Sequence, residues 1–276
     1  MIIDSHAHVI SDDRRRYPLL SDEHGPDTRW YLDEGVTAER LAELLGPADV
    51  DRALLVQPAI AYGDDNRYVL DSVSRHRDFF GVVGCTGHPI LPGDVERLLD
   101  ESGVVSLRLF DVGSGVLADP RTTEVAETLA ARSAPLVLHT DVDRLSDLVQ
   151  LMKSVPKLEV VLDHGAVAHV PDPRAPVPWA SGGPLRELAV HPQIHIKVTP
   201  VLFSYAPDAD LPRAATDLVA AFGPDRLLWG SDFSHSRGPY AALVKQVLHF
   251  VRNLPDAHQC AVLGGTALRL WPDLAA

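Results

Sequence analysis

The 276-residue sequence predicts an α/β fold, a single-domain (β/α)8 barrel that spans residues 1–276. Three observations favour this fold. Eight short apolar runs rich in Val, Ile and Leu recur at intervals of roughly thirty residues, as repeated strand–helix units do. Helical patterns separate most of these runs, and no Gly/Ser-rich linker divides the chain. The sequence therefore predicts eight parallel strands that close on themselves.

The predicted strands are continuously apolar instead of alternating, as expected when helices cover both faces of a parallel sheet. They lie at Ile2–His8, Arg52–Gln57, Phe79–Cys85, Val104–Phe110, Pro135–His139, Leu158–His164, His195–Thr199 and Arg226–Asp232. Residues 38–45 and 123–130 are clear examples of the helical patterns between them. A doubly wound open sheet is the rival architecture, but it requires a Gly-rich phosphate loop after the first strand. The chain carries His6-Ala7-His8 there, so we favour the barrel.

Three long irregular segments follow predicted strands one, six and seven. They are Ser11–Asp33, Val170–Gly183 and Thr199–Asp210, and they are rich in Pro, Asp and Arg. In a barrel these segments emerge at the face that carries active sites. We therefore expect them to cover a bound substrate.

Composition restricts the classes of partner. Hydrophobic residues make up 46% of the chain and charged residues 23%, which is typical of a globular protein. The formal net charge of −13 disfavours nucleic acid and anionic membranes as partners but leaves an anionic small molecule open. No apolar stretch has the length of a membrane span, and no signal-peptide pattern begins the chain. Cys85 and Cys260 form no CxxC pair, so we expect reduced, buried thiols in a cytoplasmic protein.

Polar residues cluster where predicted strands end. His6 and His8 lie two residues apart and so point to the same face of strand one. Other strand ends carry His139, Asp163-His164 and Asp232. The carboxyl ends of barrel strands meet at one mouth, so these side chains should converge. Imidazoles with one carboxylate suit a divalent ion such as Zn²⁺, with an open position for water.

Each of these residues also has a structural interpretation. A single His can cap an apolar run, Asp163 can hold an imidazole in place, and Asp232 can cap the helix that follows. His235, three residues past Asp232, is an intermediate candidate. It is improbable that four separate strand ends carry His or Asp for unrelated structural reasons, so their occurrence together favours a functional cluster.

Candidate substrate-binding residues follow from charge and position. Arg108 ends strand four and either clamps a substrate carboxylate through its guanidinium or forms a salt bridge within the barrel rim. Four further residues lie at or just beyond strand ends and can donate to a carbonyl or hydroxyl: Gln57, Tyr62, Asn66 and Lys197. Lys197 has a buried ion pair as its alternative role.

An ordered series of motifs resembles the amidohydrolase superfamily, in particular the lactonases and decarboxylases typified by 2-pyrone-4,6-dicarboxylate lactonase. The series consists of Asp4-Ser5-His6-Ala7-His8, Leu54-Leu55-Val56-Gln57-Pro58, the segment 62–71, Leu107-Arg108-Leu109, Val161-Leu162-Asp163-His164-Gly165, Leu228-Trp229-Gly230-Ser231-Asp232 and the segment 264–270. The resemblance covers nearly the whole chain and implies a distorted TIM (β/α)8 barrel.

The resemblance also implies roles for individual residues. Asp232 is expected to be the general base for an attacking water, with His164 available to stabilise the oxyanion. Some members of the superfamily hold zinc through residues that correspond to His6, His8, His139 and Asp232. The pyrone-dicarboxylate lactonase instead works without a metal, its histidines polarising the carbonyl. The presence of His139 favours Zn²⁺ here, and metal-independent catalysis is the alternative.

The expected function is therefore hydrolysis, most simply the opening of a small carboxylated lactone. One alternative is metal-dependent non-oxidative decarboxylation of an aromatic or dienoic acid. Another is a non-catalytic barrel that binds a ligand, which the complete His/His/His/Asp set disfavours. The sequence leaves the oligomeric state open, including a homo-oligomer, because the apolar stripe at 242–251 can pack on the barrel or on a partner.

Overall fold

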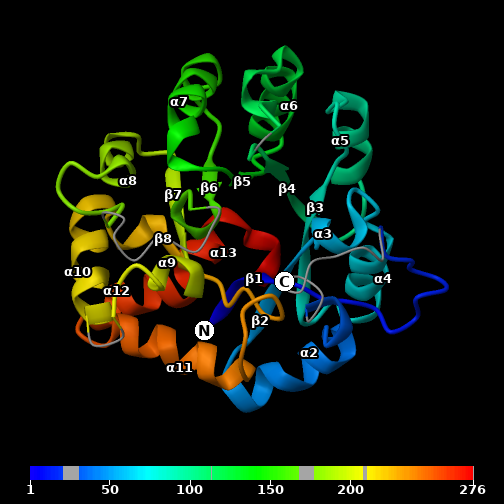
Figure 1. Cartoon of the computed structure of the whole chain (residues 1–276), viewed down its shortest axis with the longest axis horizontal. Helices are drawn as coiled ribbons and strands as arrows, with labels where there is room; N and C mark the ends of the chain where they lie inside the picture. The colour runs from blue at the N-terminus through cyan, green and yellow to red at the C-terminus, as the bar shows by residue number, and fades with distance from the viewer. Residues whose placement is uncertain (21–30, 113, 168–176, 208–209, 276) are drawn as a thin grey trace.

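The computed structural model describes residues 1–20, 31–112, 114–167, 177–207 and 210–275. Its sheet has eight parallel strands in the order β1 to β8 (Figure 1). The strands are β1 Ile3–Ala7, β2 Arg52–Val56, β3 Phe80–Cys85, β4 Val104–Phe110, β5 Leu136–His139, β6 Val160–Leu162, β7 Ile194–Val198 and β8 Leu227–Trp229. All eight predicted strands are confirmed, and the barrel is the observed fold.

The largest differences from the predicted strand ends are in strands six and eight. Strand six was expected to reach His164 and strand eight to reach Asp232, but they end at Leu162 and Trp229. His164 and Asp232 have left-handed backbones, with φ of 54° and 53°, so neither continues a strand. Both residues therefore leave the sheet at the mouth of the barrel.

The barrel is distorted where it closes. Ala7 of β1 and Phe233, in the segment after β8, form an isolated parallel bridge. The amide of Asp232 donates to the carbonyl of His6 across this seam at 2.7 Å. The pairing of β1 with β2 shifts register between Asp4 and Ala7, and another shift occurs between β3 and β4. The seam brings the ends of β1 and β8 together.

Helices surround the sheet (Figure 1). They are α2 Ala38–Leu45, α3 Ala59–Tyr62, α4 Arg67–Arg75, α5 Pro92–Leu99, α6 Pro120–Ala131, α7 Leu145–Ser154, α8 Pro184–Glu187, α9 Pro200–Phe203, α10 Leu211–Phe222, α11 Tyr240–Val251, α12 Asp256–Cys260 and α13 Thr266–Leu270. The helical patterns predicted at 38–45 and 123–130 are confirmed as α2 and part of α6. The apolar stripe of α11 is buried in the main hydrophobic core through Leu243, Val247 and Phe250.

A second, smaller core fills the barrel itself. Val137, Val161 and Leu228 belong to it, and α13 with the residues after it contributes Leu270 and Trp271. The helix α13 lies near the centre of the ring of helices in Figure 1. Side chains alternate along a strand, so the residues two positions further along the strands point to the same interior. The apolar layer thus supports a polar layer above it.

Among the described residues, no helix combines the length and the apolar character that crossing a membrane requires. Cys85 is buried as predicted, but Cys260 is exposed, because it ends α12 on the outside of the barrel. The prediction of two buried thiols is therefore wrong for Cys260. The segments expected to cover the substrate fall partly on residues 21–30, 168–176 and 208–209, which lie outside the described residues.

Candidate active site

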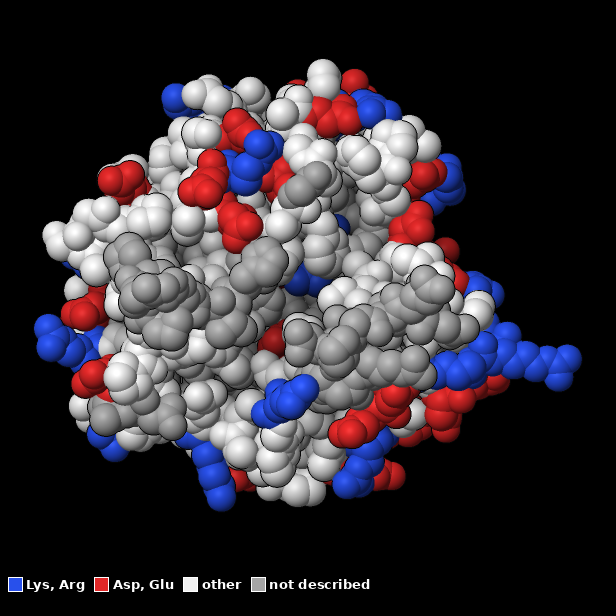
Figure 2. Space-filling view, in the orientation of Figure 1, with Lys and Arg blue, Asp and Glu red and all other residues white. Residues whose placement is uncertain are grey.

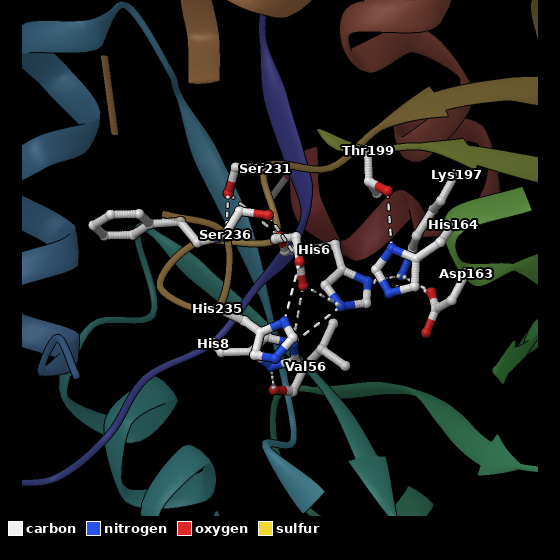
Figure 3. A network of polar contacts seen from close by, with 12 residues as sticks. His6, His8, Val56, Asp163, His164, Lys197, Thr199, Ser231, His235 and Ser236 are labelled. Carbon is white, nitrogen blue, oxygen red and sulfur yellow. Dashed lines mark hydrogen bonds and ion pairs between the residues drawn. The ribbon is translucent and has the colours of Figure 1, made fainter. Parts of the chain in front are cut away.

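Two histidines and one aspartate meet at the seam of the barrel. The Nε2 atoms of His6 and His8 lie 3.1 Å apart. The Oδ1 atom of Asp232 lies 3.6 Å from Nε2 of His6 and 3.5 Å from Nε2 of His8. All three side chains are buried. We call His6, His8 and Asp232 the His–Asp triangle; Figure 3 shows its two imidazoles in the network of contacts around them.

The His–Asp triangle can form because the backbone after β8 passes close to His6 on β1. A Cβ atom on Gly230 would lie 2.5 Å from Cβ of His6, so only glycine allows the chain after β8 to pass there. Two residues later, Asp232 adopts its left-handed conformation, which is uncommon for a residue other than glycine. Such conformations concentrate at functional sites, where the surrounding structure holds them in place.

The protonation states at the triangle follow from its contacts. Nδ1 of His8 lies 2.8 Å from the carbonyl of Val56, which only accepts, so the proton of the neutral ring lies on Nδ1. Burial lowers the pKa of His8 and holds the pKa of His6 well below 6.5, so both rings are neutral. Burial alone would raise the pKa of Asp232, but contacts with His235 and His8 outweigh it and hold that pKa well below 3.8. Asp232 is therefore a carboxylate.

The triangle fits three ligands of a tetrahedral metal ion. Zinc bonds of about 2.0–2.1 Å place neighbouring ligand atoms about 3.3 Å apart. The observed separations of 3.1, 3.5 and 3.6 Å bracket that value. The same three residues form a group whose ligand atoms all lie within 4.8 Å of one another.

His139, the predicted fourth ligand, does not join this group. It ends β5 and lines the pocket, but its Nδ1 lies 3.5 Å from Nη2 of Arg108. Its ring contacts the rings of Phe110 and His164, with centroid separations of 5.3 and 5.6 Å. Three of the four predicted ligands therefore meet in this structure, and the ring of His139 lies among Arg108, Phe110 and His164.

Asp163 is the centre of a buried charge cluster beside the triangle. Its Oδ2 accepts from Nε of Arg108 at 2.6 Å. Its Oδ1 lies 3.0 Å from Nζ of Lys197 and 3.2 Å from Nδ1 of His6. Burial alone would raise the pKa of Asp163, but the positive charges of Lys197 and Arg108 and the hydrogen bond with His6 hold it well below 3.8. The ion-pair alternatives considered for Arg108 and Lys197 are thus both observed.

A cavity of about 140 Å³ opens above these residues. Its lining consists of His8, Tyr31, Pro58, Ala59, Ile60, Arg108, Phe110, His139, His164, Val201, Asp232 and His235. The guanidinium of Arg108 lies over the ring of Phe110, 4.2 Å from its centroid. In Figure 2 the face toward the viewer is hollowed near its centre, with basic and acidic side chains at the floor of the hollow. The cavity has the character of a small-molecule site, with polar groups on one side and apolar walls on the other.

Two further histidines complete the polar side. Nδ1 of His164 lies 2.8 Å from the hydroxyl of Thr199, which fixes the ring, and burial lowers the pKa of His164 to about 4. Nδ1 of His235 lies 3.4 Å from Oδ2 of Asp232, and the hydroxyl of Ser236 donates to the same oxygen at 2.9 Å. The sequence alone left the role of His235 undecided and did not identify Tyr31 as a residue of the cavity wall. The position of His235 three residues after Asp232 is the one sequence feature that places it near the site.

Four of the five predicted substrate-binding residues do not line this cavity. The amide nitrogen of Gln57 donates to the carbonyls of Gly63 and Asp65, between α3 and α4, at 3.0 Å each. The hydroxyl of Tyr62 accepts from the amide of Ser11 at 2.8 Å. The side chain of Asn66 bonds to both the amide and the carbonyl of Cys85, at 2.9 and 2.7 Å. Buried backbone groups need partners, and these side chains supply them. Lys197 also lies beneath the cavity and not in its wall.

The amidohydrolase family model matches residues 3–272. Two characterised relatives are each 29% identical to the chain. An L-fucono-1,5-lactonase of Burkholderia ambifaria aligns over 256 residues, 87% of this chain and 86% of the relative. A 4-sulfomuconolactone hydrolase of Rhizobium radiobacter aligns over 244 residues, 84% of this chain and 75% of the relative.

Solved structures share the fold over nearly the full length. A candidate 2-pyrone-4,6-dicarboxylic acid hydrolase from Pseudomonas putida superposes with a TM-score of 0.77 at 23% identity, covering 99% of this chain and 97% of that one. An amidohydrolase from Burkholderia multivorans with bound zinc superposes with a TM-score of 0.76 at 22% identity, covering 99% of both chains. At these identities the likeness establishes the fold.

Proposed function

The chain belongs to the amidohydrolase family of hydrolases, and we propose that it is a lactonase that opens a small carboxylated lactone by water attack on the ring carbonyl. The two characterised relatives support this reaction class, because both are named for the hydrolysis of lactones. The distorted barrel with a polar mouth is the scaffold on which this chemistry is built.

One observation carries the proposal. The carboxylate of Asp232 lines the cavity, is buried with 1% of its surface exposed, and is ionised because its contacts with His235 and His8 hold its pKa well below 3.8. As a general base, Asp232 takes a proton from a water molecule while the water oxygen bonds to the carbonyl carbon. The tetrahedral intermediate then collapses, the bond from carbon to the ring oxygen breaks, and Asp232 returns its proton to that oxygen. The product is a hydroxy acid.

Donors around the cavity would stabilise the charge that develops on the carbonyl oxygen. His164 is held in orientation by Thr199 and lines the cavity beside Asp232. A pre-oriented donor in a buried site gains more from a developing oxyanion than the same donor in water. We therefore assign oxyanion stabilisation to His164.

A divalent metal, which we propose to be Zn²⁺, would be held by His6, His8 and Asp232. When bound, such an ion polarises a carbonyl and lowers the pKa of water, and both effects favour the same attack. In the metal-independent alternative, the imidazoles at the mouth polarise the carbonyl themselves. Asp232 serves as general base in both cases.

Arg108 would bind the carboxylate of the substrate. Its Nε is paired with Asp163, but the residue also lines the cavity, so one guanidinium can contact both groups. Lys197 and Arg108 together carry two positive charges against the single charge of Asp163. The carboxylate of Asp232 balances the remaining charge, so the expected preference for an anionic substrate rests on the guanidinium of Arg108 in the cavity wall.

The test is a substrate panel followed by acid release in a pH-stat. The panel contains carboxylated lactones, the methyl ester of each, neutral sugar lactones and aromatic acids, and carbon dioxide is measured in parallel. We expect acid release from lactones and faster turnover of each carboxylated lactone than of its methyl ester. Carbon dioxide release from an aromatic acid with no lactone hydrolysed would contradict the proposal and favour the decarboxylase.

A further inference from the structure

Apolar side chains line the part of the cavity nearest its mouth. They are Pro58, Ala59, Ile60, Phe110 and Val201, which we call the apolar rim. The parallel strands all run toward the mouth, so residues at or beyond a strand end lie nearest the opening. Pro58 to Ile60 follow β2, Val201 follows β7, and Phe110 is the last residue of β4. The apolar rim therefore surrounds the part of a ligand that points toward solvent.

The charged side chains of the lining lie deeper than the apolar rim. Arg108 precedes Phe110 by two residues on β4, so both side chains point into the barrel and Arg108 lies one layer below. The guanidinium lies 4.2 Å from the centroid of the Phe110 ring. Tyr31 and His235 lie beside Asp232, since their rings are 5.1 Å apart and His235 contacts Asp232 at 3.4 Å. The polar groups thus gather around Arg108 and Asp232, away from the segments that form the apolar rim.

The apolar rim offers a ligand few hydrogen bonds. None of its five side chains carries a polar atom. The carbonyl of Pro58 accepts from two amides of α3 at 2.8 and 3.0 Å, and the carbonyl of Ala59 accepts from the amide of Gly63 at 2.8 Å. The carbonyls of Phe110 and Val201 accept from serine hydroxyls at 2.7 and 2.6 Å. A ligand therefore contacts the apolar rim chiefly through hydrocarbon.

Ile60 is the most exposed residue of the apolar rim. Its side chain is 44% exposed, although it is large and apolar, and it lies in the first turn of α3. A ligand that covers Ile60 with carbon removes apolar surface from water, which is favourable. A ligand that places a hydroxyl there gives up hydrogen bonds to water and gains none from the side chains of the rim. Ile60 therefore distinguishes between the two kinds of ligand.

We infer that the substrate is a carboxylated lactone whose ring presents alkyl or unsaturated carbon to the mouth, with few free hydroxyls, and that Ile60 selects for it. The carboxylate binds at Arg108 on the floor, while the ring carbons pack against the apolar rim above. Polyhydroxylated lactones are disfavoured because their hydroxyls would face hydrocarbon. The inference rests on the proposed function for the bond that is cleaved, but its recognition of the ring is independent of the reaction.

The first experiment measures binding without hydrolysis. Two cyclopentanecarboxylic acids, with either a methyl or a hydroxyl group at the same ring carbon, mimic the two kinds of lactone but have no scissile bond. Isothermal titration calorimetry gives their dissociation constants. Exchanging methyl for hydroxyl in an apolar pocket costs about 100-fold, so the methyl acid should bind at least about tenfold more tightly at this partly open rim. Equal binding, tighter binding of the hydroxyl acid, or binding of neither would overturn the inference.

The second experiment tests the role of Ile60. Ile60→Asn should lower the preference for the methyl acid at least about threefold, because its amide can bond to the hydroxyl. Ile60→Leu keeps hydrocarbon at this position and should retain the preference within about twofold. Leu248→Asn, at a position 41% exposed on α11 and outside the cavity lining, is the matched control and should change neither binding nor turnover. An unchanged preference in Ile60→Asn, shown to be folded by circular dichroism, would overturn the role of Ile60.

Hydrolysis of the corresponding methyl and hydroxyl lactones separates the inference from the proposed function. We expect kcat/KM to be at least about tenfold higher for the methyl lactone. Turnover of neither lactone, with the binding preference intact, would overturn the proposed lactonase and leave the selectivity of the apolar rim standing. Faster turnover of the hydroxyl lactone would support the lactonase and overturn the inference.

Discussion

Asp163→Asn should strongly destabilise the fold, because it removes the negative charge that pairs with two buried cations, Arg108 and Lys197. Asp163 contacts Arg108 at 2.6 Å and Lys197 at 3.0 Å, and the three side chains are 0–5% exposed. Removing one partner of a buried ion pair costs about 3–5 kcal/mol, since the remaining charges stay buried without compensation. We expect a loss of that size in the free energy of unfolding.

The loss should be visible as a lower melting temperature. An unfolding entropy of about 2.1 cal/mol/K per residue gives about 0.6 kcal/mol/K for this chain, so about 3–5 kcal/mol corresponds to about 5–9 °C. Circular dichroism during thermal and urea unfolding measures both quantities. Asp273→Asn, at an exposed position, is the control and should change the free energy of unfolding by no more than about 0.5 kcal/mol.

A double mutant tests the cause. If unpaired charge destabilises Asp163→Asn, then adding Lys197→Met should recover at least about 1 kcal/mol of the loss, because the two sites are in contact and should not act additively. The reasoning would be refuted if Asp163→Asn melted within about 2 °C of wild type.

Three further predictions concern pH, substrate charge and metal. Burial lowers the pKa of His139 to about 3 and of His164 to about 4, so below the ordinary value of 6.5 only the unfolded chain takes up these protons. Asp4 acts in the opposite direction, because burial raises its pKa to about 6. As the pH falls, the folded chain therefore protonates Asp4 before the unfolded chain does, which offsets the destabilisation by one of the two histidines. The melting temperature of the metal-free protein should therefore fall from about pH 6.5 to about pH 4, and a flat profile would be inconsistent with neutral, buried histidines. Arg108→Gln should lower kcat/KM for a carboxylated lactone roughly 10–100-fold more than for its methyl ester, the size of a lost charge-assisted hydrogen bond, and equal losses would remove Arg108 from substrate binding. Chelation should lower turnover and added zinc should restore it, whereas full activity after verified metal removal would favour the metal-independent alternative.

The sequence was sufficient to predict the barrel because burial on both faces makes parallel strands continuously apolar, and that signal is local. Strand ends were less predictable. The ends of β6 and β8 depend on left-handed residues, His164 and Asp232, whose conformations are held by contacts across the seam. No local pattern distinguishes such a residue from the last residue of a strand.

The site was predictable at the level of which strand ends face the mouth, because a parallel barrel brings all these ends together. Distances within the mouth were not predictable. His139 and His6 both end strands, yet only His6 joins the triangle, because the seam between β1 and β8 sets that geometry. Gln57 and Asn66 bond to backbone groups outside the cavity, and such bonds are invisible in a strand-end pattern.

Turnover by Asp232→Asn is the most direct test of the central claim, that this carboxylate is the general base. The substitution preserves the shape of the side chain but removes its ability to accept a proton. Loss of a general base costs roughly 10²–10⁴-fold in rate, so kcat for a lactone substrate should fall at least about 100-fold. Circular dichroism should show a folded protein, and the exposed Asp225→Asn should retain wild-type activity. A folded Asp232→Asn protein with kcat within about tenfold of wild type would contradict the account.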